Sequence, residues 1–310
     1  MGRRAPRAGR WAALLLGLLL VLPALAAPPV PLLWKVSDAD NAVYLLGSFH
    51  LLRPDDYPLA AEVQAAFDDA AAVVFELPPE EMGSPAVASG MARAAQRRRP
   101  GTLREDLGPG LWSRLEAYAG PNGLPLAQLS QVEPWYVGLV VTLASMQRQG
   151  LDPALGLDRH LMEAAVRAGK PTAGLERAEQ QIAVLAGMAP AEQVQMLAQA
   201  LEQAEEGPDL VDGLHAAWRE GDDARLWREM GEPLRRGYPD LYARVNVDRN
   251  NAWLPQIERY LARDRGDTLV VVGALHLLGD DGLVELLRAK GYRVERVCDA
   301  CAARRAGPRT

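Results

Sequence analysis

The sequence predicts an α/β fold with a mixed central sheet, strand ends that carry a site, and a large helical insertion in the middle. Three observations support this fold class. Short apolar segments gather toward the two ends of the 310-residue chain, helical patterns fill the part between them, and no Pro/Ser-rich linker divides the chain. Strands that connect through helices form such a sheet. We therefore expect a single catalytic domain over residues 27–297, with the helical insertion at about 80–260.

The first part of the chain is expected to form a hairpin, a helix and a third strand. Two apolar segments around a polar turn predict a β-hairpin over residues 34–48. Apolar residues at helical spacing follow over residues 57–70. The segment "AAVVFELPP" is a strand that ends at Pro78 and Pro79.

The rest of the chain alternates helices with three further short strands. Strands are expected at residues 170–176, 267–276 and 292–297. Helices are expected at 134–150, at 157–170 with an end at Gly169, over 176–231 with breaks at "MAP", "EEGPD" and "EGDD", at 242–263 with a weak point near Pro255, and at 282–291. The apolar strand "DTLVVVGALH" therefore lies far along the chain from the first hairpin.

Composition limits the class of protein. Hydrophobic residues make up 49% of the chain, which is enough for a sizeable core. The formal net charge is −6, whereas nucleic-acid-binding proteins are usually basic. We expect no nucleic-acid partner.

Residues 1–26 have the features of a signal peptide. Four arginines precede the apolar run "WAALLLGLLLVL", and small residues at "ALA" supply a cleavage site after Ala26. The run is short for a membrane span, which needs ~20 apolar residues. We expect an exported protein, periplasmic or secreted, with no transmembrane anchor after processing; the alternative is an uncleaved anchor.

Two cysteines, Cys298 and Cys301, open a C-terminal tail at residues 298–310. An exported protein can form a disulfide there, although a C-x-x-C bridge closes only a small loop. Two cysteines are too few for a structural zinc site. We interpret them as a peripheral pair.

Two segments more than 200 residues apart share one pattern. Residues 43–52, "VYLLGSFHLL", and residues 269–278, "LVVVGALHLL", each have four apolar strand residues followed by G-x-x-H and Leu-Leu. The motif residues are Gly47 with His50 and Gly273 with His276. A single histidine after a strand is more often structural, but two of the chain's four histidines hold equivalent positions.

Two other predicted strands end in a carboxylate, at Glu76 and Glu176. In an open α/β sheet, ligands bind beyond the carboxyl ends of the strands, so these residues converge with His50 and His276 if the strands are parallel. A glutamate at a strand end can also simply cap the next helix.

Two imidazoles and one carboxylate form a ligand set suited to a divalent transition metal such as manganese, cobalt or zinc. Such an ion lowers the pKa of a bound water and polarises a carbonyl, and a second carboxylate can act as general base. The other two histidines, His160 and His215, are expected to be half-buried or on the surface without a ligand role.

These residues resemble the TraB/GumN family, which groups with the Tiki proteins in a wider set of proposed metallohydrolases. The resemblance covers residues 32–297 and includes "YLLGSFH", "VVFELP", "LDRHLMEAAVRAGKPTAGLE", "AWREGD", "DRNNAWLPQIERYL" and "VVVGALHLLG". It implies a metal site at His50, Glu76 and His276.

The resemblance also gives a role to Arg249, in "DRN". A helix at this position lets the arginine reach the strand ends and bind a substrate carboxylate or an oxyanion. The alternative is an ordinary surface ion pair. Glu176 is added as the candidate general base from its position alone, and Gly47 and Gly273 match the motif glycines.

The predicted function is an exported metal-dependent hydrolase that cleaves a peptide or amide bond in a peptide or protein substrate. Two alternatives remain open. One is an esterase-like hydrolase without a metal, in which a histidine acts as base. The other is a non-catalytic protein that binds a peptide or signal.

Overall fold

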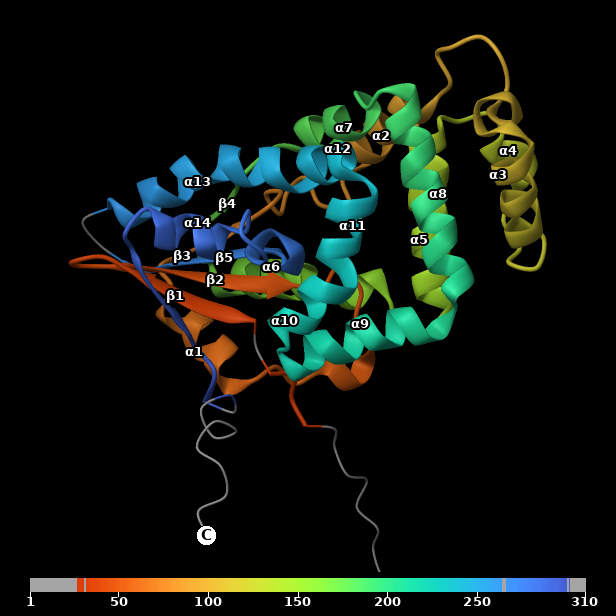
Figure 1. Ribbon diagram of the computed structural model, residues 1–310. Helices are drawn as coiled ribbons and strands as arrows, with labels where there is room; N and C mark the ends of the chain where they lie inside the picture. Colours follow the sequence, from red (N-terminus) through yellow and green to blue (C-terminus); the bar gives the residue numbers. More distant parts are fainter. Residues whose placement is uncertain (1–26, 31, 264–265, 300, 302–310) are drawn as a thin grey trace, which may run out of the picture.

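The computed structural model describes residues 27–30, 32–263, 266–299 and 301 (Figure 1). The predicted signal peptide at residues 1–26 and most of the tail at 298–310 lie outside the described residues. Within the described part of the chain, no helix has the length and apolar character needed to cross a membrane.

A six-stranded mixed sheet forms the centre of the molecule and confirms the predicted α/β fold. The strands are β1 (Leu33–Ser37), β2 (Ala42–Ser48), β3 (Ala72–Phe75), β4 (Thr172–Gly174), β5 (Thr268–Gly273) and β6 (Arg293–Arg296). Their order across the sheet is β4-β3-β5-β2-β1-β6. The first four strands in this order are parallel to one another, whereas β1 is antiparallel to both β2 and β6. The carboxyl ends of β2, β3, β4 and β5 therefore meet at one edge.

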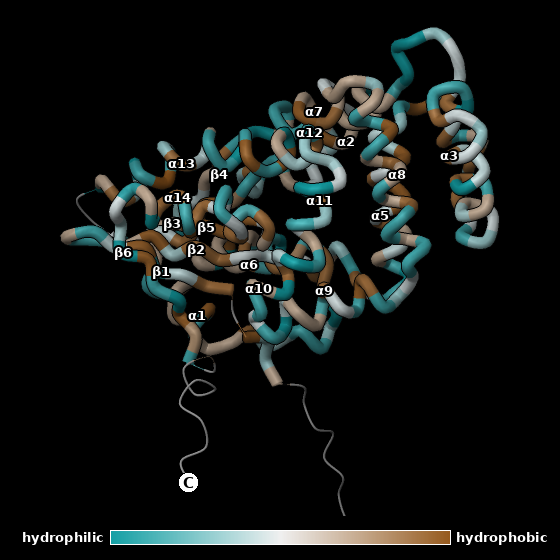
Figure 2. The backbone as a smooth tube through the Cα atoms, in the orientation of Figure 1, coloured by the Kyte–Doolittle hydropathy of each residue, from teal (hydrophilic) through white to brown (hydrophobic). Residues whose placement is uncertain are grey.

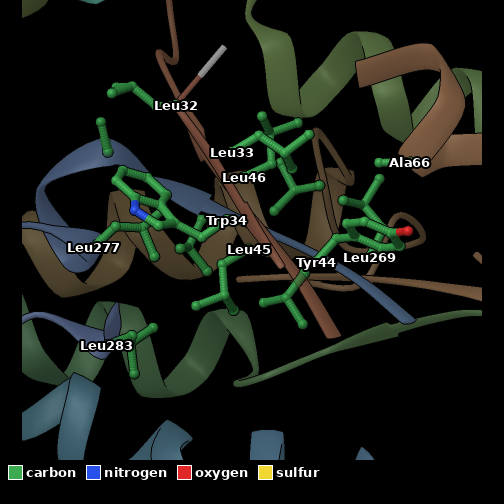
Figure 3. Packing of buried hydrophobic residues seen from close by; sticks show 14 of the residues in the cluster. Leu32, Leu33, Trp34, Tyr44, Leu45, Leu46, Ala66, Leu269, Leu277 and Leu283 are labelled. Atoms are coloured by element: carbon green, nitrogen blue, oxygen red, sulfur yellow. The ribbon is translucent and has the colours of Figure 1, made fainter. Parts of the chain in front are cut away.

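The predicted hairpin is formed by β1 and β2, with Leu33 opposite Leu46 and Trp34 opposite Leu45. Side chains alternate between the two faces of a strand. Figure 3 shows Leu33 and Leu46 on the side of Ala66, and Trp34 and Leu45 on the opposite side. Every residue of β2 is buried, because the sheet is covered on both faces.

Helices lie on both faces of the sheet. Those that contact or flank it are α1 (Ala61–Asp69), α6 (Leu157–Ala168), α13 (Asp248–Leu261) and α14 (Leu283–Ala289). In Figure 1, α13 and α14 lie on one face and α1 on the other. Side chains from α1, α6, α13 and α14 join the strands in one buried apolar cluster.

The remaining helices form the predicted helical middle. They are α2 (Pro85–Ala95), α3 (Leu103–Ala119), α4 (Leu126–Leu129), α5 (Pro134–Arg148), α7 (Ala178–Ala186), α8 (Pro190–Glu206), α9 (Pro208–Glu220), α10 (Asp223–Leu226), α11 (Glu232–Gly237) and α12 (Pro239–Tyr242). Short 3₁₀ turns are η1 (Pro54–Asp56), η2 (Pro153–Leu155) and η5 (Ala274–Leu277), and π-helical turns are η3 (Trp227–Gly231) and η4 (Ala243–Val247).

Much of this middle part stands apart from the sheet. The long helices α5 and α8 lie side by side, and α3 packs against α8 (Figure 1). Apolar residues of α3, α5 and α8 form one buried cluster, and Figure 2 shows hydrophobic, brown segments in α5 and α8. The chain returns to the sheet inside the range 80–260, where α6 contacts β3 and β4 joins the edge.

Local sequence explains where several helices begin and end. Gly169 ends α6 in the left-handed conformation with φ 66°, which a glycine adopts at no steric cost. The breaks predicted between residues 176 and 231 separate α7, α8, α9 and α10. The helix α13 continues across Pro255, and the irregular turn lies earlier, in η4. The predicted weak point near Pro255 was therefore misplaced.

Candidate metal centre

The parallel strands bring the predicted site residues to one edge of the sheet. His50 follows β2, Glu76 follows β3, Glu176 follows β4, and His276 lies in η5 directly after β5. Arg249 reaches the same edge from the first turn of α13. Residues from five distant parts of the sequence thus surround one point.

Glu76 lies at the centre of this group. Its Oε1 accepts a hydrogen bond from the backbone N–H of Gly273 at 2.8 Å, and its Oε2 accepts one from Arg249 Nη2 at 2.5 Å. Gln181 Nε2 lies 3.3 Å from the same Oε2. Burial raises the pKa of Glu76, but Arg249 and the neighbouring histidines, together with the Gly273 N–H, outweigh burial and lower that pKa to about 2. The carboxylate is therefore ionised at neutral pH.

His276 is held by Asn250. The amide nitrogen of Asn250 donates to the backbone carbonyls of His276, at 3.3 Å, and Asp281, at 2.8 Å. The amide oxygen therefore accepts from His276 Nδ1, at 2.7 Å, and Nε2 is left as an acceptor that Arg249 Nη1 contacts at 3.1 Å. Burial lowers the pKa of His276 to about 3, so the imidazole is neutral. The positive charge that keeps Glu76 ionised therefore comes first from Arg249, with His50 as a second cation.

His50 is held by the start of α6. Its Nδ1 donates to Asp158 Oδ1 at 3.1 Å. The helix comes this close because Gly156 packs against the backbone of His50, where a Cβ would overlap the carbonyl. Burial lowers the pKa of His50, but the Asp158 and Glu76 carboxylates together outweigh it and raise that pKa to about 9, so the imidazole is protonated at neutral pH. The His50 side chain is 56% exposed, so it is the member of the group that solvent reaches most easily.

Arg249 joins the two carboxylates. Its Nη2 lies 2.6 Å from Glu176 Oε1 as well as 2.5 Å from Glu76 Oε2, and its Nε donates to Glu176. The guanidinium carbon lies 4.6 Å from the centre of the Trp253 ring. Arg249 is only 15% exposed. The arginine thus lies inside the site and not in a surface ion pair.

The two motif glycines allow side chains and neighbouring segments to pack closely at this edge of the sheet. A Cβ on Gly273 would lie 3.3 Å from both Glu76 Oε1 and His50 Nε2, and 3.7 Å from the His276 ring. A Cβ on Gly47 would lie 3.1 Å from Leu32 and 3.2 Å from the Ala274 backbone. Gly273 therefore leaves room in the site itself, whereas Gly47 lets neighbouring elements pack closely.

Three adjoining hollows open over these residues. One of about 390 Å³ includes His50, Glu76 and Gln181 in its wall, and one of about 210 Å³ shares these three and adds Arg249. A third, of about 240 Å³, shares Arg249 and includes Glu176. The site residues therefore lie along a groove and not in a closed chamber.

The donor set fits a divalent metal in its chemistry. Both imidazoles direct Nε2 toward the site while a carboxylate or amide holds Nδ1, which is how ligating histidines are oriented. His276 Nε2 and Glu76 Oε1 are 3.9 Å apart, which two metal bonds of ~2.0–2.1 Å can span.

Arg249 contacts both Glu76 and His276, which are two of the groups that such an ion would bind. In the described residues, no group of three or more His, Cys, Asp or Glu side chains is arranged to hold a metal. His50, Glu76 and His276 would suit the ion after Arg249 has released Glu76, with Glu176 left as the partner of the arginine.

The two remaining histidines differ from each other. His160 is half-buried and its ring lies 4.6 Å from that of Tyr57, in line with the prediction. His215 is only 3% exposed and its Nε2 lies 2.8 Å from Asp56 Oδ2. The prediction of a half-buried or surface His215 was wrong, because Asp56 supplies the partner that lets a histidine be buried.

Sequence reasoning missed the residues that hold the site in place. Asp158 and Asn250 were not singled out, although both lie in segments with evident patterns, "LDRH" and "DRNN". Gln181 carried no signal. The two cysteines form a Cys298–Cys301 disulfide at the end of the described chain, which agrees with a peripheral pair.

Comparison with known proteins agrees with this architecture. The model of the TraB/PrgY/gumN family matches residues 32–296. The chain belongs to the TraB/PrgY/gumN family. Two relatives, each described as "Uncharacterized protein YbaP", come from Escherichia coli (strain K12) and Shigella flexneri; each is 26% identical over 258 residues, covering 79% of this chain and 87% of the relative. No solved structure matches the chain.

Proposed function

We propose that the protein is an exported hydrolase that cleaves peptide or amide bonds with the help of a divalent metal held by His50, Glu76 and His276. One observation carries the proposal: His50 Nε2, Glu76 Oε1 and the Cδ2 edge of the His276 ring surround the space that Gly273 leaves empty, and His276 Nε2 lies 3.9 Å from the same Glu76 oxygen. When bound there, a manganese, cobalt or zinc ion would supply a water of lowered pKa and polarise the substrate carbonyl.

The chain's own groups have distinct tasks in this proposal. Asp158 and Asn250 each accept a hydrogen bond from Nδ1, so Nε2 of each imidazole is turned toward the site. His50 would bind a metal through Nε2 only after releasing the proton that its raised pKa keeps there. Arg249 is placed to stabilise negative charge that develops on a carbonyl oxygen. Glu176 holds Arg249 and is the further carboxylate that we propose as general base.

The groove supports a peptide as the substrate. Its three hollows adjoin through shared residues, which suits an extended chain better than a compact small molecule. The Cys298–Cys301 disulfide supports export, because disulfides persist in oxidising compartments.

The proposal is tested on protein purified without chelator. We expect a bound divalent metal and cleavage of a quenched-fluorescence peptide library that chelator abolishes and the added metal restores. His160→Ala serves as a matched control, since His160 is half-buried and its ring packs against Tyr57. Cleavage that persists in full after complete metal removal would support the metal-free esterase-like hydrolase in its place.

A second candidate is a peptide-binding protein without turnover. The observation that favours it is the pairing of Arg249 with Glu76 and Glu176, which compensates both buried carboxylates without any ion. Peptide binding that needs these residues, with no cleavage under any metal condition, would favour this candidate.

A further inference from the structure

The hollow with the largest volume of the three over the site has a mostly apolar wall. The residues that line it and do not belong to the charged group are Leu51, Leu77, Met82, Pro153, Met162 and Val271. Leu51 follows β2, Leu77 and Met82 lie in the segment between β3 and α2, and the others come from η2, α6 and β5. Five separate elements therefore build one apolar surface directly beside His50 and Glu76.

Most polar groups in this wall already have hydrogen-bond or ion-pair partners. Asp158 contacts His50, Gln181 contacts Glu76, and Arg159 pairs with Glu163 at 3.3 Å. Ser48 lies in the wall as well but is only 2% exposed. A group that enters this hollow thus meets mainly carbon atoms and sulfur.

Met82 is the most informative of these residues. It is 39% exposed and is one of three large hydrophobic side chains that are exposed in the described part of the chain. The others are Leu143 and Val166, which do not line the hollow. Exposed apolar side chains that gather beside reactive groups mark binding surfaces, and an unbranched methionine adapts its shape to different partners.

We infer that this hollow is a specificity subsite that receives an apolar, leucine- or methionine-sized side chain of a peptide, adjacent to the bond placed at His50 and Glu76. The inference rests on the proposed function for the position of the bond, but not for the binding itself. The volume of about 390 Å³ is ample for such a side chain. An aspartate at the same position would lose hydration against this apolar wall, because the charged groups beside it already pair with one another.

The first measurement is binding, which needs no turnover. Fluorescein-labelled alanine pentapeptides with a central Leu, Met or Asp are titrated by anisotropy into the full mature chain in chelator. We expect the Leu and Met peptides to bind at least about tenfold more tightly than the Asp peptide, because the apolar side chain leaves water. Equal binding of all three, or no binding of any, overturns the inference.

Variants locate the subsite. Met82→Asp is expected to remove most of the preference for Leu, and Met82→Leu to retain it. Leu143→Asp is the matched control, since Leu143 is 41% exposed and lies on α5, away from the hollow. Circular dichroism checks that all three variants are folded. A preference that Met82→Asp leaves unchanged, or that Leu143→Asp removes equally, overturns the inference.

Turnover separates this inference from the proposed function. Selective binding of Leu peptides without cleavage in manganese, cobalt or zinc leaves the subsite standing and refutes the hydrolase. Cleavage that is indifferent to the side chain beside the bond supports the hydrolase and overturns the subsite.

Discussion

Single residues in this site hold other residues in place. Asp158 fixes His50, Asn250 fixes His276, and Glu176 fixes Arg249. Each of these contacts sets which atom of its neighbour faces the groove. The chemistry therefore depends on side chains that need not touch the substrate.

Asp158→Asn tests the first of these contacts. The amide can accept the Nδ1 hydrogen bond but carries no charge, so we expect metal affinity to fall roughly 10–100-fold while the fold is retained. Isothermal titration with zinc measures the affinity. Asp152→Asn is the control, because Asp152 is exposed and caps η2 nearby. Unchanged affinity in Asp158→Asn would show that His50 needs no support from Asp158.

Arg249→Gln tests the arginine as a competitor of the metal. Without metal, the variant leaves Glu76 and Glu176 buried and uncompensated, so we expect unfolding free energy to drop by about 3 kcal/mol. Metal affinity should rise, because Arg249 then no longer holds Glu76. Urea unfolding in chelator and zinc titration measure the two effects. Arg244→Gln, at a more exposed ion pair with Glu192, should change neither by a comparable amount.

At the scale of elements, each G-x-x-H motif follows a buried strand, and its glycine lets a neighbouring segment come close to that strand. Each glycine follows apolar strand residues, and each histidine comes three residues later. The two copies have different neighbours, since Gly273 faces the site and Gly47 faces Leu32 and Ala274. Both copies thus supply a site histidine, whereas the glycine leaves room in the site in the second copy and permits close packing in the first.

Alanine at the two glycines separates these roles. Gly273→Ala places a Cβ 3.3 Å from Glu76 and His50, so we expect metal affinity to fall at least about tenfold with little loss of stability. Gly47→Ala should instead cost about 1–3 kcal/mol of unfolding free energy, because its neighbours are packed backbone and core. Zinc titration and urea unfolding of both variants check the pair. The opposite pattern would contradict the roles assigned to the two copies.

A buried ion network ties α9 to the segment after β2. Asp56 is fully buried, and it accepts hydrogen bonds from His215, Arg219 and the backbone of Arg53. Burial raises the pKa of Asp56, but these hydrogen bonds outweigh it and lower that pKa overall. A lowered folded-state pKa stabilises the fold above the unfolded-state pKa, and the stabilisation is lost as pH falls through the folded-state value.

Asp56→Asn should therefore destabilise the protein at pH 7 by about 2 kcal/mol. The difference from the unmodified protein should shrink as the pH falls below the unfolded-state pKa of about 3.9 toward the lower folded-state pKa, where the native carboxylate takes up a proton. Urea unfolding from pH 7 to pH 3 measures it, with Asp55→Asn as the exposed control. A difference that stays constant over this range would contradict the assignment.

At the scale of the whole molecule, sequence periodicity predicted the sheet, its helices and the residues at its carboxyl edge. Four apolar strands ending in His50, Glu76, Glu176 and His276 are local patterns, and parallel pairing then brings them together. The partners of these residues were not predictable in this way. Asp158 and Asn250 come from helices whose positions on the sheet are set by packing, and the sequence pattern does not specify packing.

The same limit explains the two errors. His215 appeared ordinary because its partner Asp56 lies 159 residues away and no local pattern connects them. Pro255 was expected to weaken its helix, but α13 continues across it and packs Trp253 and Ile257 into the core. Tertiary burial stabilises the helix enough to offset the missing hydrogen bond.

The most direct test of the metal centre is the metal content of five purified alanine variants, measured together with peptide cleavage. We expect His50→Ala, Glu76→Ala and His276→Ala to lose most of the metal and the activity together. Glu176→Ala and Arg249→Ala should keep the metal but slow turnover, by about 2.7–4 kcal/mol in transition-state stabilisation if Arg249 contacts the developing charge. Full metal content and full activity in His50→Ala and His276→Ala would contradict the account.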